Sequence, residues 1–475
     1  MPFRVAERTF SMDDQQRFAE LSGDRNPIHL DPLAARRTQA GAVVVHGVHA
    51  VLWALEQLAR ENCLRQPVAQ LEVRFDHFIY LETGVTLDVI RHDDARLRAR
   101  LFAGAANAAT LDITYGSPEP QLPPIASASD PQLDSPWTGG LEQFGQRSGT
   151  IAPARTSASS VFPVAAACIG ETHLDAVARL SYLVGMVCPG LHSVFSGFSL
   201  GFTRTAGDGA ASPLRYRVTK IDERFRLIEI AVEGSDAIGT VTAFVRHPPI
   251  AQHSLDVVRR SVGAAEFAQT TALVAGGSRG LGALTARIIA AGGGRVVLTY
   301  ATGEADALGV AREIGSERCA VLRLDVRDDP AARLEELPWP VDQLYYFASP
   351  PINRHTGRTF TQRRFEEFCD FYVSGFERLW TALRSRTSGS LRAFYPSSSA
   401  VEERPRDMTE YAMAKAAGEL LCDDLNRFTP GAGAHILSCR LPRILTDQTV
   451  TMMPVETSDG LDVMLPIVRE LHSAS

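Results

Sequence analysis

The stretch from Ser22 to Gly47, SGDRNPIHLDPLAARRTQAGAVVVHG, constrains the fold of this chain more than any other. Asp24 and His29 lie five residues apart, on either side of Asn26-Pro27. Proline restrains its own φ angle and the backbone of the residue before it, so this segment is predicted to be a formed turn and not the interior of a helix. An acid and a base can therefore face one pocket.

Two helices are predicted after this turn. Asp31-Pro32 offers a side-chain acceptor for an N-cap and a ring for the first helical position, which predicts a short helix through Arg36 and Arg37. The segment Val43–Leu58 is apolar nearly all round, which is typical of a helix buried on most sides.

The run GDRNPIH at residues 23–29, followed by His46-Gly47, resembles the signature of the MaoC-like (R)-specific enoyl hydratases and 3-hydroxyacyl dehydratases. The resemblance implies a hot-dog fold, a curved antiparallel sheet around one long buried helix. It also implies that Asp24 and His29 are the catalytic pair and that N–H groups near Gly47 polarise a thioester carbonyl. Dehydration needs two proton-transferring groups beside one substrate, and a helix N-terminus stabilises an enolate-like oxygen. The D-x4-H spacing alone would equally suit a capped turn with His29 and His46 as structural histidines.

Composition favours small-molecule chemistry. The chain has 475 residues, which predicts about three domains. Its net charge is −7 and it has no long basic cluster, so we expect no nucleic-acid or membrane partner. The seven cysteines are scattered without metal-ligand spacing, so we predict reduced cysteines and no metal site. The first residues lack the apolar core of a signal peptide, and no uncharged run is long enough to span a membrane, so we expect a cytoplasmic protein.

The first hot-dog unit is predicted to cover residues 1–116. Its remaining strands are expected at Val68–Ile79, Gly84–Arg91, Leu97–Ala103 and Ala108–Tyr115. Residues 117–156 are rich in proline and serine and are predicted to be a linker.

A second hot-dog unit is predicted at residues 157–250. A helix is expected at Glu171–Val187, with strands at Ser193–Thr203, Ser212–Asp222, Phe225–Glu233 and Ala237–His247. The run LVGMVCPG at residues 183–190 also resembles MaoC-like sequences, but this half has no D-x4-H, and we interpret His173 and His192 as structural. The two halves would form a pseudo-dimer with one catalytic pocket. The second half would line this pocket without contributing catalytic residues.

A different pattern of predicted elements begins at Thr270. Ala272–Ala275 is predicted to be a short buried strand, followed by the glycine turn GGSRGLG at residues 276–282 and a helix to about Ala291. Such a turn lets backbone approach a pyrophosphate at a helix N-terminus. Further strands are expected at Arg295–Thr299 and at Ala320–Leu324, the latter ending at Asp325-Val326.

The glycine spacing resembles the short-chain dehydrogenase/reductase family, and so do Ser398 and the Tyr411-x-x-x-Lys415 pair. The resemblance implies that Lys415 lowers the pKa of Tyr411, that Tyr411 passes a proton to a carbonyl as hydride arrives, and that Ser398 holds that oxygen. The resemblance runs from about Thr271 to Thr446, and a reductase domain is predicted to cover residues 265–475. Taken alone, Tyr-x-x-x-Lys would also suit a solvated helix face. The residues implied in cofactor binding are Gly276, Ser278, Arg279, Gly280, Leu281, Gly282, Thr302, Asp325, Val326, Ala348, Tyr411, Lys415, Pro442 and Thr446.

The second strand of this domain favours NADPH as the cofactor. Thr299–Thr302 carries no carboxylate for a ribose 2′-hydroxyl, whereas Arg279 and Thr302 could meet a 2′-phosphate. Arg279 could otherwise be a solvated loop charge. NADPH in turn favours reduction.

The chain departs from the reductase pattern at several points, which bear on activity and on assembly. The helix that carries the family's catalytic asparagine reads FYVS at residues 371–374, so that asparagine is missing. YFAS at residues 346–349 replaces Asn-Asn-Ala-Gly, and Pro442-Arg443 replaces Pro-Gly. No seventh strand follows the helix expected at Asp459–Leu471, so a homo-oligomer would not use that strand.

The sequence therefore predicts an α+β double hot-dog followed by an α/β Rossmann-type doubly wound parallel sheet. The predicted function is a bifunctional 3-oxoacyl thioester reductase and 3-hydroxyacyl thioester dehydratase in acyl-chain synthesis, with substrates carried on coenzyme A or acyl carrier protein. Two alternatives stay open. One is a hydratase and 3-hydroxyacyl dehydrogenase of β-oxidation, and the other is a dehydratase with an inactive nucleotide-binding docking domain.

Overall fold

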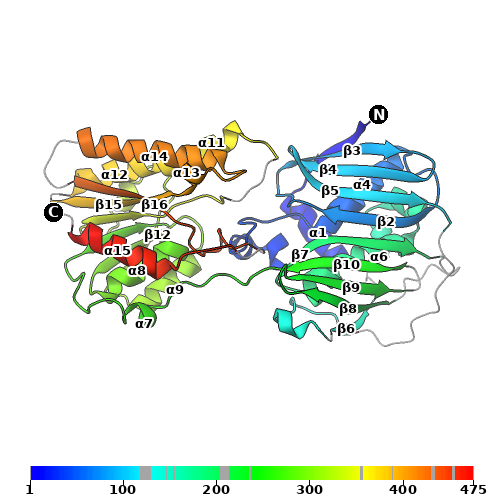
Figure 1. Ribbon diagram of the computed structural model, residues 1–475, viewed down its shortest axis with the longest axis horizontal. Coiled ribbons are helices and arrows are strands. Elements are labelled where there is room, and N and C mark those ends of the chain that lie inside the picture. Colours follow the sequence, from blue (N-terminus) through cyan, green and yellow to red (C-terminus); the bar gives the residue numbers. More distant parts are fainter. Residues whose placement is uncertain are drawn as a thin grey trace. The chain divides into compact units, whose positions relative to one another are not determined.

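The computed structural model describes residues 2–117, 130–145, 147–152, 156–203, 213–234, 237–352, 357–387, 389–428, 434–451 and 455–473. Its contacts divide the chain into two compact units (Figure 1). Unit 1 comprises Met1–Pro248, His355–Gly357 and Thr451–Pro454. Unit 2 comprises Pro249–Arg354, Arg358–Val450 and Val455–Ser475.

Unit 1 is built on one ten-stranded antiparallel sheet with the order β1-β3-β4-β5-β2-β7-β10-β9-β8-β6. The strands are β1 (Phe3–Thr9), β2 (Val68–Phe75), β3 (Gly84–His92), β4 (Arg96–Ala103), β5 (Ala106–Tyr115), β6 (Ser148–Ile151), β7 (Ser193–Phe202), β8 (Leu214–Asp222), β9 (Leu227–Glu233) and β10 (Ala237–Val245). The two predicted halves join where β2 pairs with β7, in a register that places Val73 opposite Phe198. They share one sheet and one core, so the expectation of about three domains differs from the two units observed.

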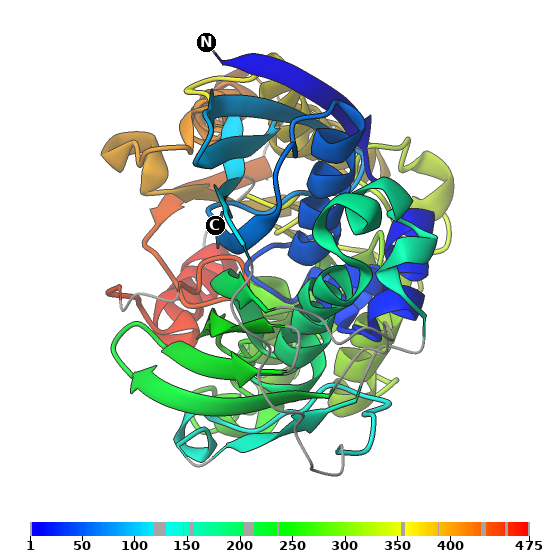
Figure 2. The same ribbon diagram turned by 90° about the vertical axis from the view of Figure 1, so that its right-hand side faces the viewer.

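The helices of unit 1 pack on this sheet (Figure 2). They are α1 (Met12–Ser22), α2 (Pro27–Leu30), α3 (Pro32–Ala35), α4 (Gly47–Arg60), α5 (Pro163–Ile169) and α6 (Glu171–Tyr182), with 3-10 turns η1 (Leu141–Gln143) and η2 (Ala158–Ser160) and a π-helical turn η3 (Leu183–Val187) after α6. Helices α4 and α6 are buried along most of their lengths and contact each other. Each half thus has a long buried helix, as predicted.

The buried helix of the first half begins later than predicted. It starts at Gly47 and not at Val43, because the backbone of the preceding valines is engaged elsewhere. Val44 forms a β-bridge with Tyr80, and Val45 N–H donates to the Ile79 carbonyl at 2.8 Å. A run of β-branched residues suits such an extended segment better than a helix.

The predicted linker is partly folded into unit 1. Strand β6 pairs with β8, Phe144 is fully buried, and the rings of Trp137 and Phe144 lie 5.0 Å apart. These apolar side chains anchor a segment whose average composition predicted a linker. Residues 118–129, 146 and 153–155 of the predicted linker lie outside the described residues.

Unit 2 is built on a six-stranded parallel sheet with the order β13-β12-β11-β14-β15-β16. Its strands are β11 (Thr271–Ala275), β12 (Arg295–Tyr300), β13 (Cys319–Arg323), β14 (Gln343–Tyr346), β15 (Leu391–Ser398) and β16 (Ala434–Leu441). Its helices are α7 (Leu255–Val258), α8 (Gly280–Ala291), α9 (Glu304–Ile314), α10 (Ala331–Leu334), α11 (Gln362–Cys369), α12 (Gly375–Arg386), α13 (Ala400–Glu403), α14 (Thr409–Phe428) and α15 (Gly460–Ser473), with a π-helical turn η4 (Asp370–Ser374) between α11 and α12.

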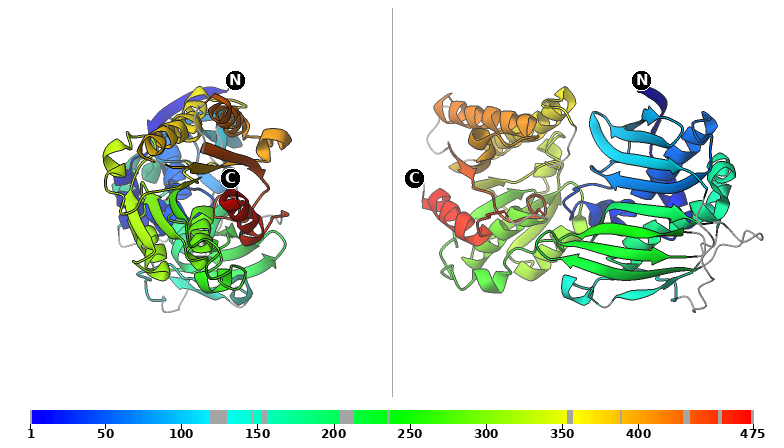
Figure 3. Two further views of the ribbon diagram at one scale, coloured as in Figure 1. Left: turned by 90° about the vertical axis from the view of Figure 1, so that its left-hand side faces the viewer. Right: turned by 45° about the vertical axis from the view of Figure 1, so that its right-hand side comes forward.

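Helices cover both faces of this sheet (Figures 1 and 3). Alternate residues of β11 enter different cores: Ala272 and Val274 pack with α8 and α15, whereas Leu273 and Ala275 pack with α12 and α14. Strand order runs outward from β11 in both directions, so the topology reverses between β11 and β14. In open α/β sheets, ligands bind at the carboxyl ends of the strands beside such a reversal. Within the described residues the sheet ends at β16.

Candidate active sites

The turn that carries Asp24 and His29 is fixed by its own caps. Helix α1 ends at Gly23, whose φ of 81° favours glycine. Asn26 caps α2 by accepting a hydrogen bond from Ile28 N–H, with Pro27 at the first helical position. The Asn26 amide also donates to the carbonyl of Gly185, at 2.9 Å. The second half of the unit thus anchors the turn.

Asp24 is buried and accepts hydrogen bonds on both carboxylate oxygens. Ser181 Oγ on α6 donates to Oδ2 at 2.7 Å, and Asn26 N–H donates to Oδ1 at 3.1 Å. Desolvation raises the pKa of Asp24, while His29, Ser181 and Asn26 oppose that rise. A Cβ at Gly185 would collide with the carboxylate, so the close approach of η3 requires glycine there. The protonated form of Asp24 is therefore accessible at a higher pH than for an ordinary aspartate.

His29 is oriented by one backbone carbonyl. Its Nδ1 lies 2.8 Å from Val44 O, and because a carbonyl only accepts, Nδ1 carries a proton. In the neutral ring Nε2 then holds the lone pair that can take a proton. Desolvation lowers the pKa of His29, against the opposing effect of Asp24. His29 is thus set up as a neutral base.

His46 lies beneath this pair. Its ring stacks on His29 with centroids 3.9 Å apart, its Nδ1 lies 2.9 Å from Gln15 Oε1, and its Nε2 lies 3.1 Å from the Asp24 carbonyl. Burial lowers its pKa well below the usual range. Donor atoms of Asp24, His29 and His46 lie within 4.8 Å of one another, a spacing that a metal ion could bridge, but both His46 nitrogens already face oxygen atoms.

Gly47 is the first residue of α4, and His46 provides no side-chain cap. The N–H groups of the first turn therefore lack intrahelical partners and carry partial positive charge. A Cβ at Gly47 would lie 2.9 Å from the Phe75 ring, so only glycine fits this approach without displacing that ring. The structure thus places Asp24, His29 and the start of α4 around one site.

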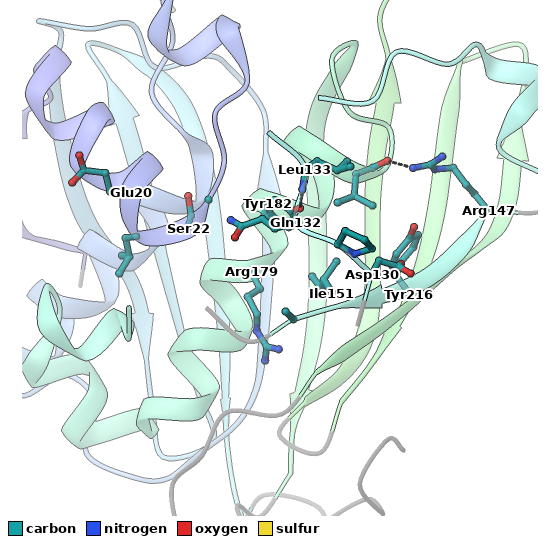
Figure 4. A pocket seen from close by; sticks show the side chains of 15 residues that line it. Glu20, Ser22, Asp130, Gln132, Leu133, Arg147, Ile151, Arg179, Tyr182 and Tyr216 are labelled. Carbon is teal, nitrogen blue, oxygen red and sulfur yellow. Dashed lines mark hydrogen bonds between the residues drawn. The ribbon is translucent and has the colours of Figure 1, made fainter. Parts of the chain in front are cut away.

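A cavity of about 330 Å³ adjoins the Asp24 turn (Figure 4). It is lined by Glu20, Leu21, Ser22, Gly23, Asp130, Pro131, Gln132, Leu133, Arg147, Ile151, Ala152, Arg179, Tyr182, Val187 and Tyr216. Tyr182 follows Ser181 and accepts a hydrogen bond from Leu133 N–H at 2.8 Å. Arg147 Nη2 donates to the Val187 carbonyl at 2.7 Å, and its guanidinium lies 3.9 Å from the Trp137 ring centroid. Most of its exposed wall is apolar, and its polar side chains come from several elements, among them Glu20 on α1, Arg179 on α6 and Tyr216 on β8.

Gln15, Ser181 and this cavity were not predicted from the sequence. Their signals are long-range, since Ser181 meets Asp24 across 157 residues of chain. His173 and His192 lie apart from the catalytic pair: His173 is buried between the carbonyls of Ile169 and Thr203, at 2.7 and 2.8 Å, whereas burial lowers the pKa of His192 to about 4.

The glycine turn of unit 2 lies at the end of β11. Gly276 has a φ of 74°, and a Cβ there would lie 2.8 Å from Ala348 N, so the turn requires glycine for two reasons. Helix α8 begins at Gly280, with Leu281 and Gly282 in its first turn and Ser278 just before it. This is the strand, turn and helix that the sequence predicted.

The other predicted cofactor residues gather at the same edge of the sheet. Thr302, Asp325, Val326, Ala348, Pro442 and Thr446 all lie within five residues after a strand of the parallel sheet, and Ser398 ends β15. Asp325 accepts hydrogen bonds from Arg327, which lowers the pKa of Asp325. Arg279 Nη1 forms an ion pair with Asp447 Oδ2 at 2.9 Å. Its contact with a 2′-phosphate stays a prediction.

Ser398, Tyr411 and Lys415 lie close together, as the resemblance implied. Ser398 forms a side-chain hydrogen bond with Tyr411. Lys415 Nζ donates to the Pro396 carbonyl at 2.6 Å and lies 6.0 Å from the Tyr411 ring centroid. Desolvation raises the pKa of Tyr411 and the Ser398 hydrogen bond opposes it. The expected lowering of the Tyr411 pKa by Lys415 is therefore not seen, and the Lys415 ammonium donates its hydrogen bond to the Pro396 carbonyl.

One family model matches part of the chain. A family model described as MaoC like domain matches residues 1–108, the segment that contains Asp24, His29 and Gly47. A comparison with curated protein sequences finds no match. None of the helices that the structure describes has the length and apolar character needed to cross a membrane.

Several solved structures similar to the chain are short-chain dehydrogenases/reductases. A protein from Pseudomonas syringae described as a short chain dehydrogenase is 23% identical, covers 44% of this chain and 92% of its own, and has a TM-score of 0.37. FolM alternative dihydrofolate reductase 1 from Brucella suis, in complex with NADP, is 15% identical over 36% of this chain and 72% of its own, with a TM-score of 0.33. SDR:Glucose/ribitol dehydrogenase from Brucella melitensis is 19% identical over 38% and 77%, with a TM-score of 0.34. These similarities are too weak to support an argument about the function of unit 2.

Proposed function

We propose that this protein is a bifunctional enzyme, a 3-hydroxyacyl thioester dehydratase in unit 1 and an NADPH-dependent 3-oxoacyl thioester reductase in unit 2. In fold terms these are a double hot-dog and a Rossmann-type sheet. The observation that carries the proposal is the placement of Asp24 and His29 on one turn beside the N-terminus of α4, within the segment that matches the MaoC-like family.

Dehydration follows from the protonation states of the pair. Neutral His29 takes the proton from C2 through Nε2, and protonated Asp24 gives its proton to the 3-hydroxyl, which leaves as water while the C2–C3 double bond forms. The first turn of α4 at Gly47 stabilises the negative charge on the thioester oxygen. The proton gained by His29 must then return to Asp24 through solvent before the next turnover.

The acyl group of the substrate occupies the cavity beside Gly23. Its largely apolar wall suits an acyl chain, and two of its lining residues, Gly23 and Tyr182, are the sequence neighbours of Asp24 and Ser181. The carrier, coenzyme A or acyl carrier protein, stays outside this pocket.

The residues of unit 2 fit a nicotinamide dinucleotide. Side chains in the glycine turn would fill the space next to the backbone, so glycine leaves that space open for a pyrophosphate. The residues that follow the strands lie along the carboxyl edge of the parallel sheet, namely Thr302, Asp325, Val326, Ala348, Pro442 and Thr446. When bound, NADPH supplies hydride. Tyr411 donates the proton to the carbonyl oxygen, and Ser398 hydrogen-bonds that oxygen. NADPH is favoured over NADH because no carboxylate ends β12 and Arg279 flanks the turn.

The two activities fit one reaction sequence, since the product of the reductase is the substrate of the dehydratase. We therefore propose a role in fatty-acid or polyketide-type acyl-chain synthesis. A second candidate, a dehydratase with a docking module that does not turn over, is favoured by one observation: Tyr372 stands in η4, where the reductase family has its asparagine.

The deciding experiment offers the purified protein short 3-oxoacyl and 3-hydroxyacyl thioesters on both carriers, with NADPH or NADH, and identifies the products by mass spectrometry. The proposal expects the 3-oxoacyl substrate to give both 3-hydroxyacyl and enoyl thioesters with NADPH. Enoyl product from the 3-hydroxyacyl substrate alone, without NADPH oxidation, supports the docking module. Oxidation of 3-hydroxyacyl thioester with NAD as the preferred cofactor would support the β-oxidation alternative.

A further inference from the structure

Tyr372 is held in one orientation at the centre of unit 2. Its side chain is 1% exposed and its hydroxyl lies 2.6 Å from Ser349 Oγ. Ser349 Oγ donates its single proton to the Pro350 carbonyl at 2.9 Å, so Tyr372 is the donor in the bond between the two hydroxyls. The Tyr372 carbonyl accepts a further hydrogen bond from Tyr395 Oη at 3.0 Å. Both the ring and the backbone of this residue are therefore fixed.

The face of the Tyr372 ring meets the ammonium group of Lys415. Lys415 Nζ lies 3.9 Å from the centroid of this ring, closer than to the rings of Tyr395 at 5.1 Å and Tyr411 at 6.0 Å. Lys415 is 5% exposed, and its hydrogen bond goes to the Pro396 carbonyl. In the part of the chain that the structure describes, no carboxylate forms an ion pair with it. A buried ammonium in such surroundings needs another source of negative potential, and an aromatic face supplies one.

We propose that Tyr372 is a positioning residue for Lys415: the face of its ring holds the ammonium group at the Ser398–Tyr411 site and favours its protonated form. The electrostatic claim concerns the protein alone, whereas its consequence for reduction rests on the proposed function. Tyr372 thus gives the site a support for lysine that differs from the asparagine that the resemblance led us to expect.

The other groups around Lys415 do less than Tyr372 to stabilise its positive charge. On α14, Glu419 and Cys422 favour the charged lysine, but Glu419 is engaged by Arg440 of β16 and by Ser397 of β15. Desolvation raises the pKa values of Tyr372, Tyr395 and Tyr411, so these phenols stay neutral. Burial lowers the pKa of Lys415 to about 7, so modest changes in its surroundings shift its charge near neutral pH.

The charge of Lys415 can be measured directly because the chain contains few lysines. Of its 48 lysine and arginine residues, only Lys220 and Lys415 are lysines. Lys220 is exposed on β8 in unit 1 and serves as an internal reference. Protein grown with lysine labelled with ¹³C at Cε should give two lysine signals, and their chemical shifts against pH report each ammonium without cofactor or substrate.

Three variants separate the ring from its hydroxyl and from general packing. Tyr372→Phe keeps the ring face and loses the bond to Ser349, whereas Tyr372→Leu and Tyr372→Met lose the ring face. Phe368→Leu is the matched control, because Phe368 stacks on Tyr372 with centroids 5.7 Å apart but presents no face to Lys415. Two ring-less variants are used so that one folding failure, detected by circular dichroism, leaves the other to decide.

We expect Lys415 to titrate near the same pH in the parent, in Tyr372→Phe and in Phe368→Leu. Its pKa should fall by about one unit in Tyr372→Leu and Tyr372→Met, because loss of the ring removes stabilisation of the charged form. Lys220 should not move. An unchanged Lys415 pKa in the ring-less variants, or an equal fall in Phe368→Leu, would overturn the proposal. A protein that fails to oxidise NADPH would count against the proposed reductase but would leave this titration intact.

Discussion

Ser181 and Asp24 join the two halves of unit 1 through a hydrogen bond of 2.7 Å between Oγ and Oδ2. Ser181 lies on α6 of the second half, whereas Asp24 lies on the turn of the first. The sequence predicted that the second half supplies wall and not chemistry. This bond, together with the glycine at position 185, shows that the second half also holds the candidate acid.

Ser181→Ala tests that relationship through pH dependence. The hydrogen bond lowers the pKa of Asp24, so its loss should raise that pKa further. Because the proposed mechanism uses protonated Asp24, the alkaline limb of the kcat/KM profile for dehydration should move to higher pH. The exposed Ser160 offers a matched control, Ser160→Ala, in which the profile should stay in place. A uniform loss of rate at every pH would instead indicate a packing role for Ser181.

Asp24→Asn should nearly abolish dehydration. The amide keeps the shape of the carboxyl group but cannot transfer the proton, so we expect a loss of at least about a hundredfold in rate. Reduction by unit 2 should be unaffected, which gives each preparation its own folding control. If the purified variant dehydrates a 3-hydroxyacyl thioester as fast as the parent, the site is wrongly assigned.

The cavity beside Gly23 predicts the length of acyl chain that the dehydratase accepts. Ala152 lines the cavity, and Ala152→Phe would reduce its volume without removing a buried side chain. We expect kcat/KM for long acyl thioesters to fall by at least about tenfold while short ones are spared, because a chain that no longer fits loses its apolar contacts. Ala167→Phe, on an exposed position of α5, is the control. Equal effects on short and long substrates would show that the acyl group lies elsewhere.

The sequence predicted those parts of the sites that depend on local rules. Asn26 and Pro27 set the turn that carries Asp24 and His29, and cap chemistry of this kind acts over a few residues. Apolar patterns located most strands to within a few residues, whereas β1 and β6 were not predicted. Gln15, which fixes His46, gave no such signal, since a buried glutamine is recognised only from its partner across the fold.

Contacts between segments that are distant in the sequence could not be predicted either. The pairing of β2 with β7 merges two predicted domains into one sheet, and it depends on which edges are left open once each half has folded. The ion pair between Arg279 and Asp447 joins residues 168 positions apart, so the loop cation predicted for a phosphate has a carboxylate partner that the sequence did not reveal.

Cofactor preference can be measured through Arg279. We expect NADPH to bind more tightly than NADH, and Arg279→Ala to narrow the difference by about 1.5–3 kcal/mol, the typical contribution of a charge-assisted hydrogen bond. Asp447→Asn removes the carboxylate that competes with a 2′-phosphate for Arg279, so this variant should widen the difference between the affinities for NADPH and NADH. Titration of nicotinamide fluorescence gives both dissociation constants, and equal values in the parent protein would refute the preference.

The last prediction decides whether unit 2 is an enzyme. It retains Ser398, Tyr411 and Lys415 close to one another, but the segment FYVS at residues 371–374 lacks the family's asparagine. Tyr411 is the direct proton donor in the proposed mechanism, whereas the asparagine would only hold relay water, so reduction of a 3-oxoacyl thioester by NADPH should be slow but measurable. Tyr411→Phe should abolish it while NADPH binding and dehydration persist, because the change deletes one hydroxyl and keeps the ring. Should the parent fail to consume NADPH with any acyl thioester on either carrier, or should Tyr411→Phe reduce as well as the parent, unit 2 is better explained as a docking module.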